Sequence, residues 1–315
     1  MQTAMDLGLL VLGLALLVQS AKIFVDASVD IARRLRIPRL IIGLTIVAMG
    51  TSAPEVVISV SAAVSGATDL AVANVIGSNL FNLMFIVGFC ALLYPIAVKT
   101  AKISRDYWVS VAATLALFAM LAFFGEVIPR WASAILLAGF VVYMFVLVRH
   151  AVKNKTDEAE EEGTKPPKGL VISIVLAIVG AGLIVLGGQL TVNSAVNIAT
   201  TIGITERVIG LTIVAMGTSL PEVVTTLIAC KKKEGEFAIG FIVGSSVFNI
   251  MFVLGLAGVV APLAIGDGVI FDISVLTFGT LMFFFLAKSS QKVVRAEGLA
   301  MLLVFFAYMT IVLWP

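Results

Sequence analysis

Charged residues and histidine are scarce in this chain of 315 residues, and their scarcity indicates its class. Charged side chains make up 13% of the chain and hydrophobic ones 60%, whereas soluble domains average about a quarter charged. This composition predicts an integral membrane protein. One histidine, His150, and two cysteines, Cys90 and Cys230, give no basis for a histidine-rich transition-metal site, a thiolate metal site or a disulfide framework. The net charge of +2 comes from dispersed basic residues and gives no support for nucleic-acid binding.

Ten apolar stretches are long enough to cross a bilayer as helices, which takes about 20 residues each. They run approximately over residues 5–26, 39–64, 70–97, 107–127, 130–149, 169–190, 207–230, 237–264, 269–287 and 296–314. No basic residue precedes the first stretch, so we expect a first transmembrane helix there and not a secretory signal. The stretches are too long, and lack the alternation, expected of membrane strands.

Basic residues gather in the loops on one side of these ten spans. The loops after spans 1, 3, 5, 7 and 9 hold clusters such as Lys231–Lys233, whereas the opposite loops hold Arg130 and Arg207. The positive-inside rule therefore puts both termini outside and the basic loops in the cytoplasm, across the cell (inner) membrane. The longest loop, 151–168, is charged and contains proline, so we expect a solvated cytoplasmic linker.

The chain contains an internal duplication. A shift of 167 residues places "IGLTIVAMGTSAPEVV" (42–57) on "IGLTIVAMGTSLPEVV" (209–224), with one mismatch. The same shift places "GSNLFNLMFIVG" (77–88) on "GSSVFNIMFVLG" (244–255). A repeat of this length indicates two copies of one structural unit, which we expect to contain the same sites.

Each half holds five spans, an odd number, so the second half enters the membrane from the opposite face. The predicted fold is an all-α polytopic membrane protein with ten helices in two inverted-topology repeats, residues 1–150 and 169–315, and with helices 2 and 7 broken. In secondary transporters this arrangement puts the substrate site at the midplane, between interrupted helices.

Both GTSxPE segments combine a helix breaker with oxygen-bearing side chains. Pro54 removes the backbone donor that would bond the carbonyl of Gly50, and Pro221 does the same to Gly217. Backbone carbonyls freed at membrane depth need protein, a cavity or a bound ion to satisfy them. Na⁺ and Ca²⁺ are hard cations that prefer oxygen ligands.

Side chains four residues apart share a helical face, and four such pairs carry oxygen. These pairs are Thr51 with Glu55, Thr218 with Glu222, Ser78 with Asn82, and Ser245 with Asn249. The two glutamates would repel each other unless one Ca²⁺, two Na⁺ or two protons joined them. Competition for one site, combined with alternating access, gives antiport.

The paired GTSxPE and GSxxxN segments resemble the alpha repeats of the sodium/calcium exchanger family, within the cation/calcium exchanger superfamily, of the prokaryotic type without a large regulatory loop. The resemblance implies calcium ligation by the carboxylates of Glu55 and Glu222 and the carbonyls of Thr51 and Thr218. The implied sodium ligands are Ser52, Ser219, Ser78, Ser245 and the carbonyls of Ala48 and Ala215. By their symmetry with the glutamates, we expect Asn82 and Asn249 to be ligands too.

Two positions depart from the family pattern. Asn249 stands where some relatives, including potassium-dependent exchangers, have aspartate, which argues against potassium dependence. Phe241 replaces an asparagine common before the second GS motif, while its partner Asn74 keeps it.

The prediction is therefore an antiporter, not an enzyme, that exchanges Na⁺ for Ca²⁺ as substrates, needs no cofactor and works as a monomer in the lipid bilayer. A proton-coupled cation antiporter of the same fold stays open as an alternative, because protons also neutralise two glutamates. A channel or a membrane enzyme is a further alternative; the spans contain no zinc-binding histidine pair or nucleophile elbow.

Overall fold

The computed structural model describes residues 2–36, 39–97, 100–153, 169–202, 215–266, 268–290 and 292–313. Within these ranges, eight helices are long and apolar enough to cross a membrane, and one bent helix pair forms a ninth candidate span. The other expected span, 207–230, begins in residues 203–214, which lie outside the described ranges. Its described part consists of two short helices, α11 (Ala215–Gly217) and α12 (Leu220–Lys231). The chain is thus a helical, multi-pass membrane protein.

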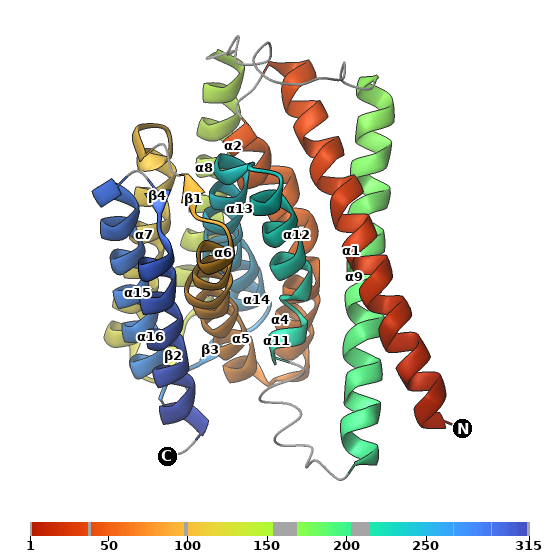
Figure 1. Ribbon diagram of the computed structural model, residues 1–315. Helices are drawn as coiled ribbons and strands as arrows, with labels where there is room; N and C mark the ends of the chain where they lie inside the picture. The colour runs from red at the N-terminus through yellow and green to blue at the C-terminus, as the bar shows by residue number, and fades with distance from the viewer. Residues whose placement is uncertain are drawn as a thin grey trace.

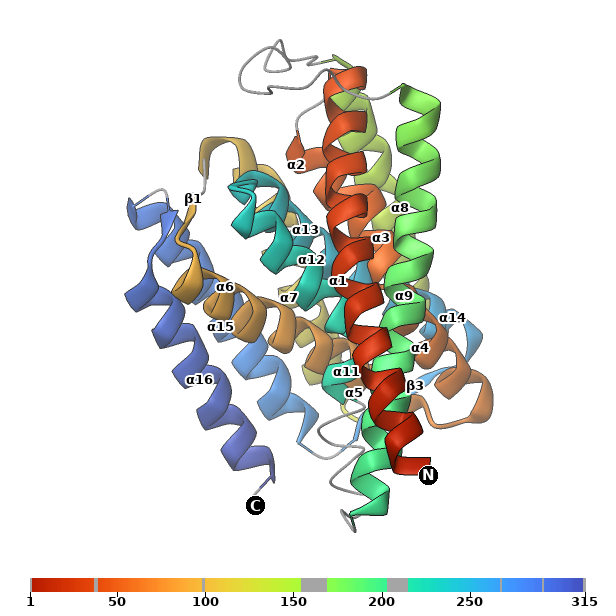
Figure 2. The same ribbon diagram turned by 45° about the vertical axis from the view of Figure 1, so that its right-hand side comes forward.

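Helices α1 (Gln2–Leu35) and α9 (Leu170–Thr201) run antiparallel along one side of the molecule (Figures 1 and 2). Both are longer than the expected spans 5–26 and 169–190, because each continues past the apolar stretch along its partner. Their backbones touch where glycines face each other: a Cβ on Gly13 would lie 3.0 Å from the carbonyl oxygen of Gly187, and the reverse distance is also 3.0 Å. Small residues at such crossings are typical of membrane helices.

The second expected span is broken into α2 (Arg39–Ile42), a π-helical turn η1 (Gly43–Val47), α3 (Ala48–Thr51) and α4 (Ala53–Ser65). The third is continuous but contains a π-helical turn: α5 (Thr68–Leu80), η2 (Phe81–Ile86) and α6 (Val87–Leu93). Helices α7 (Thr100–Phe124) and α8 (Arg130–Lys153) complete the first half. The backbone stays helical at the junctions between α-helical and π-helical turns, and no side chain caps them. The interruption of the second span is at Ser52, between α3 and α4.

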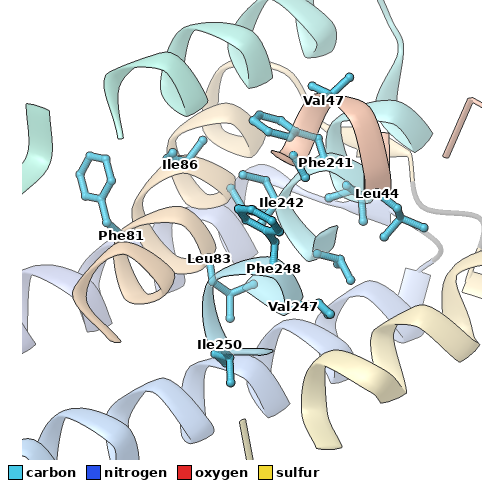
Figure 3. Close-up of a cluster of buried hydrophobic side chains, with 14 of the residues drawn as sticks. Leu44, Val47, Phe81, Leu83, Ile86, Phe241, Ile242, Val247, Phe248 and Ile250 are labelled. Atoms are coloured by element: carbon cyan, nitrogen blue, oxygen red, sulfur yellow. The ribbon is translucent and has the colours of Figure 1, made fainter. Parts of the chain in front are cut away.

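The second half repeats these elements. After α12 come α13 (Gly235–Val247), the π-helical turn η5 (Phe248–Val253) and α14 (Leu254–Val260), then α15 (Val269–Ser290) and α16 (Arg295–Leu313). The α13–η5–α14 and α5–η2–α6 segments are the most buried of the eight candidate spans, and α13 is buried from Phe237 to Val247. In Figure 1 they lie between the α1–α9 pair and helices α15 and α16. Apolar side chains from η1, η2, α13 and η5 fill the space between them, among them Leu44, Leu83 and Ile250 (Figure 3).

In the described part of the chain, four two-residue strands join the helices near the two ends of the molecule. β1 (Ile96–Ala97) pairs antiparallel with β4 (Lys292–Val293), and β2 (Val127–Ile128) pairs antiparallel with β3 (Leu263–Ala264). β1 and β4 lie at the end opposite the start of α1 and the end of α16 (Figure 1). Each pair takes one strand from each half, so the two halves are tied together at both ends.

Candidate functional site

The GTSxPE segments form two helix breaks, at Ser52 and Ser219, and a glutamate follows three residues after each. Ser52 lies between α3 and α4 with φ −83° and ψ 14°, and Ser219 precedes α12 with φ −92° and ψ 8°. The first break bends the span by 56°. Pro54 and Pro221 occupy the first turns of α4 and α12, where a missing N–H costs no helical hydrogen bond. Both glutamates therefore sit in the first turn of a helix, where the exposed N–H groups favour negative charge.

The serines of the two breaks bond to the glutamates of the opposite halves. Ser52 Oγ donates to Glu222 Oε1 at 3.0 Å, and Ser219 Oγ donates to Glu55 Oε1 at 3.3 Å. These two bonds are related by the 167-residue shift. All four side chains are 0% exposed. The two breaks thus form one buried centre, and each half supplies a hydroxyl to the carboxylate of the other.

The GSxxxN segments reach the same centre. Ser52 Oγ lies 2.9 Å from Ser245 Oγ, and Asn82 Nδ2 donates to Ser245 Oγ at 3.2 Å. Asn82 and Asn249 both lie in π-helical turns, η2 and η5; such turns occur often at functional sites. Because η2 packs against α12 and η5 packs against α4, each asparagine stands beside the glutamate-bearing helix of the other half.

Several oxygen atoms at this centre lack hydrogen-bond partners. They are Oε2 of Glu55, Oε2 of Glu222, Oδ1 of Asn82 and Oδ1 of Asn249, and all four are shielded from solvent. Among the residues whose side-chain burial is described, none of the buried ones is a lysine, an arginine or a histidine. Leaving a buried acceptor unpaired costs about 1–3 kcal/mol, and more for a charged group. The centre therefore presents buried oxygen atoms that have no hydrogen-bond donor. A bound cation would satisfy them by coordination.

Other residues singled out from the sequence lie near this network. Thr51 is fully buried, and its hydroxyl donates to the carbonyl of Val47 at 3.1 Å. The carbonyl of Ala48 accepts the Ser52 N–H at 3.1 Å. Ser78 is buried one turn before Asn82 on α5. Thr218 lies in the turn between α11 and α12. Ala215 begins α11, and its side chain falls outside the described part.

The two halves differ at one asparagine that sequence comparison does not select. Asn249 Nδ2 donates to Asn79 Oδ1 at 3.5 Å, where the repeat would place Ser78. Asn79 is 0% exposed, and its own amide nitrogen, Nδ2, has no hydrogen-bond partner. The counterpart of Asn79 at the 167-residue shift is Ser246, whose hydroxyl bonds the carbonyl of Ile242. A search for matching residues in the two halves therefore passes over Asn79, and only its burial reveals it.

A multi-pass helical membrane protein with two half-helix breaks around a buried, oxygen-lined centre belongs to the class of secondary transporters by its architecture. The family model described as "Sodium/calcium exchanger protein" matches residues 5–149 and again residues 172–314. The chain belongs to this family of transporters, which confirms the resemblance seen in the repeated motifs.

Relatives of known name match nearly the whole chain. It is 38% identical over 304 residues to the "Putative antiporter CaxA" of Alkalimonas amylolytica, covering 94% of this chain and 95% of that protein. It is 28% identical over 343 residues to the "Sodium/calcium exchanger MaX1" of Methanosarcina acetivorans, covering 97% and 98%. The solved structure of the sodium-calcium exchanger NCX_Mj, soaked with Na⁺ and without Ca²⁺, aligns with a TM-score of 0.84 at 29% identity and covers 98% of this chain and 99% of its own.

Proposed function

We propose that this protein exchanges Na⁺ for Ca²⁺ across the membrane, and that both ions compete for the centre between Glu55 and Glu222. The observation that carries the proposal is the pair of buried carboxylates, each with one oxygen bonded by a serine of the other half and one oxygen without a partner. One Ca²⁺ or two Na⁺ would neutralise the pair. Membership in the exchanger family supports the same pair of substrates.

The ligand set consists of oxygen alone, which suits hard cations and not zinc or copper. We assign Ca²⁺ to the carboxylates of Glu55 and Glu222 with the carbonyls of Thr51 and Thr218. The amide oxygens of Asn82 and Asn249 would complete the shell. For Na⁺ we assign the hydroxyls and carbonyls at the two breaks and on α5 and α13, namely Ser52, Ser219, Ser78, Ser245, Ala48 and Ala215.

Alternating access follows from an inverted repeat of ten helices, which we propose with residues 1–150 and 169–315 as its two halves. Two features support it. The family model matches once in each half, and both helix breaks, both π-helical asparagines and both serine–glutamate bonds recur at the 167-residue shift. Since one chain supplies both halves of the centre, we propose that it works as a monomer.

The orientation follows from charge. We propose that both termini lie outside, that the basic loops and the linker 151–168 lie in the cytoplasm, and that the protein resides in the cell (inner) membrane. The start of α1 and the end of α16 lie at the same end of the molecule, and the strand that contains Lys292 lies at the other (Figure 1).

Ca²⁺ uptake into proteoliposomes tests the exchange. Vesicles preloaded with Na⁺ and diluted into Na⁺-free medium should accumulate Ca²⁺, and vesicles without a Na⁺ gradient should not. Uptake driven only by an imposed pH gradient would establish the proton-coupled alternative. Uptake that ignores both gradients would rule out antiport and leave a channel.

A further inference from the structure

A second polar pair lies one helical turn from the proposed ion site. Ser59 follows Glu55 by four residues on α4, and Asn74 precedes Ser78 by four on α5, so each shares a helical face with a site residue. Asn74 Nδ2 donates to Ser59 Oγ at 3.0 Å. Ser59 is fully buried and Asn74 partly exposed. Polar groups therefore continue from the buried centre toward the face where the turn at 66–67 joins α4 to α5.

The amide of Asn74 is oriented by this bond. Because its NH₂ group donates to Ser59, its carbonyl oxygen is left as an acceptor on the partly exposed side of the residue. An amide oxygen and a hydroxyl oxygen, both neutral, suit a cation that keeps part of its water shell. They add no charge that would hold the ion tightly.

The equivalent positions of the other half are both buried, and one of them is apolar. The 167-residue shift places Thr226 on Ser59 and Phe241 on Asn74. Phe241 is 0% exposed and Thr226 is 1% exposed, and the Thr226 hydroxyl lacks a hydrogen-bond partner. Asn74, whose amide bonds a hydroxyl in the first half, is thus replaced in the second half by Phe241, whose ring makes no hydrogen bond.

The backbone of η1 packs against the backbone of α13 at Phe241. The ring lies beside Val47 of η1 (Figure 3). A Cβ on Gly43 would lie 2.9 Å from the backbone nitrogen of Phe241, and one on Gly244 would lie 2.5 Å from the Cα of Leu44. The backbones of η1 and α13 are therefore in contact on either side of Phe241 along α13. The Phe241 side chain is 0% exposed, so it is closed off from solvent beside this contact.

From these contacts we propose that Asn74 and Ser59 form an entry site for hydrated cations from the face of the 66–67 turn, and that Phe241 closes the matching route from the face of Lys231–Lys233. The proposal rests on the exchange function above. The two faces then offer unequal routes to one centre: the first is lined by oxygen atoms, and the second opens only when η1 separates from α13.

Cysteine labelling tests the two routes in the full-length protein. The native thiols are first removed as Cys90→Ala and Cys230→Ala; their counterparts in the repeat, Ala257 and Ala63, are already alanine. Ser59→Cys and Thr226→Cys are then made singly. A membrane-impermeant methanethiosulfonate that carries a quaternary ammonium group is added to one face or the other of oriented vesicles, without Na⁺ or Ca²⁺.

We expect Ser59→Cys to react from the 66–67 face at least about tenfold faster than Thr226→Cys from the other face, because thiols react only as solvated thiolates. The proposed route past the partly exposed Asn74 lets water and reagent reach position 59, whereas the buried Phe241 keeps them from position 226. Phe241→Asn should raise the labelling rate of Thr226→Cys, and Asn74→Phe should lower that of Ser59→Cys. Equal rates at the two cysteines, or no effect of Phe241→Asn in protein that elutes as a single folded species, would overturn the proposal. If Asn74→Phe fails to fold, the other two comparisons still decide.

Labelling does not require transport, so the two proposals fail separately. Unequal labelling without gradient-driven Ca²⁺ uptake would overturn the exchange function and leave the unequal routes standing. Normal Na⁺-driven uptake with equal labelling would overturn the unequal routes alone.

Discussion

The hydroxyl of Ser52 donates a hydrogen bond to Glu222, 170 residues further along the chain and 3.0 Å away. The 167-residue shift relates this bond to a second one, which Ser219 donates to Glu55. Each carboxylate is thus oriented by the half of the chain that does not contain it. Neither half builds the centre alone, so a change on either side of this relationship should affect the whole site.

Glu55→Gln and Glu222→Gln should each reduce Na⁺-driven Ca²⁺ uptake to the background of empty vesicles. Either variant leaves one carboxylate against a divalent ion, and removing one member of a buried charge pair costs about 3–5 kcal/mol, more than a hundredfold in affinity. Initial rates of ⁴⁵Ca²⁺ uptake measure the effect. Glu126→Gln, on an exposed loop residue, is the control and should transport normally. Substantial uptake by either site variant would show that the centre lies elsewhere.

Ser52→Ala and Ser219→Ala should weaken the apparent affinity for Na⁺ more than that for Ca²⁺. Each removes a hydrogen bond to a charged group, worth about 1.5–3 kcal/mol, and a proposed Na⁺ ligand, whereas the carboxylates that bind Ca²⁺ stay. We expect about a tenfold rise in the Na⁺ concentration needed for half-maximal exchange. Ser246→Ala is the matched control, since that hydroxyl bonds its own helix at Ile242. An equal shift for both ions would contradict the assignment of the serines to Na⁺.

Much of this centre follows from the sequence because its cause is local. A proline inside a span kinks or breaks its helix, and Glu55 and Glu222, one residue after Pro54 and Pro221, fall in the first turn of the helix that starts there. The duplication then indicates a second, matching break. Spacing by four residues places Asn82 near Ser78 on one helix face without any knowledge of tertiary contacts.

The remainder depends on how the halves pack, which local patterns do not encode. Helical spacing pairs Thr51 with Glu55 of its own helix, whereas the structure pairs Ser52 with Glu222 of the other half. Helix α9 exceeds its apolar stretch where it continues along α1: Asn197, beyond that stretch, donates to Asp6 Oδ1 of α1 at 3.1 Å. Asn79 has a serine, Ser246, and not an asparagine as its counterpart in the repeat, and its bond with Asn249 depends on packing alone.

The ion pair between Lys232 and Asp26 should contribute little to stability. Lys232 Nζ also donates to the carbonyl of Lys22 at 3.3 Å, so the lysine joins the end of α12 to α1. However, the side chains are 30% and 63% exposed, and exposed pairs are worth about 0–1 kcal/mol. Asp26→Asn should therefore change the unfolding midpoint in detergent by only a few degrees, and less in high salt. A large loss of stability that persists in high salt would show that this contact does more than pair exposed charges.

Gly244→Ala should destabilise the protein, because η1 leaves no room for a side chain at this position of α13. The added Cβ would lie 2.5 Å from the Cα of Leu44 and 2.6 Å from its carbonyl oxygen. Backbone atoms cannot rotate away, so the two segments must separate. Overpacking of this kind costs about 1–3 kcal/mol. Thermal unfolding of the purified protein in detergent measures the loss.

Gly182→Ala is the matched control, since nothing lies within 4 Å of a Cβ at that position of α9. Alanine is favoured over glycine within a helix by about 1 kcal/mol, so this variant should unfold at the same temperature or higher. A lower unfolding temperature for Gly244→Ala but not for Gly182→Ala would show that the loss comes from the backbone contact. A general effect of replacing glycine in a membrane helix would lower both. If Gly244→Ala were as stable as Gly182→Ala, η1 would not be packed on α13 in the protein's stable form, and the closure of the Phe241 route would lose its structural basis.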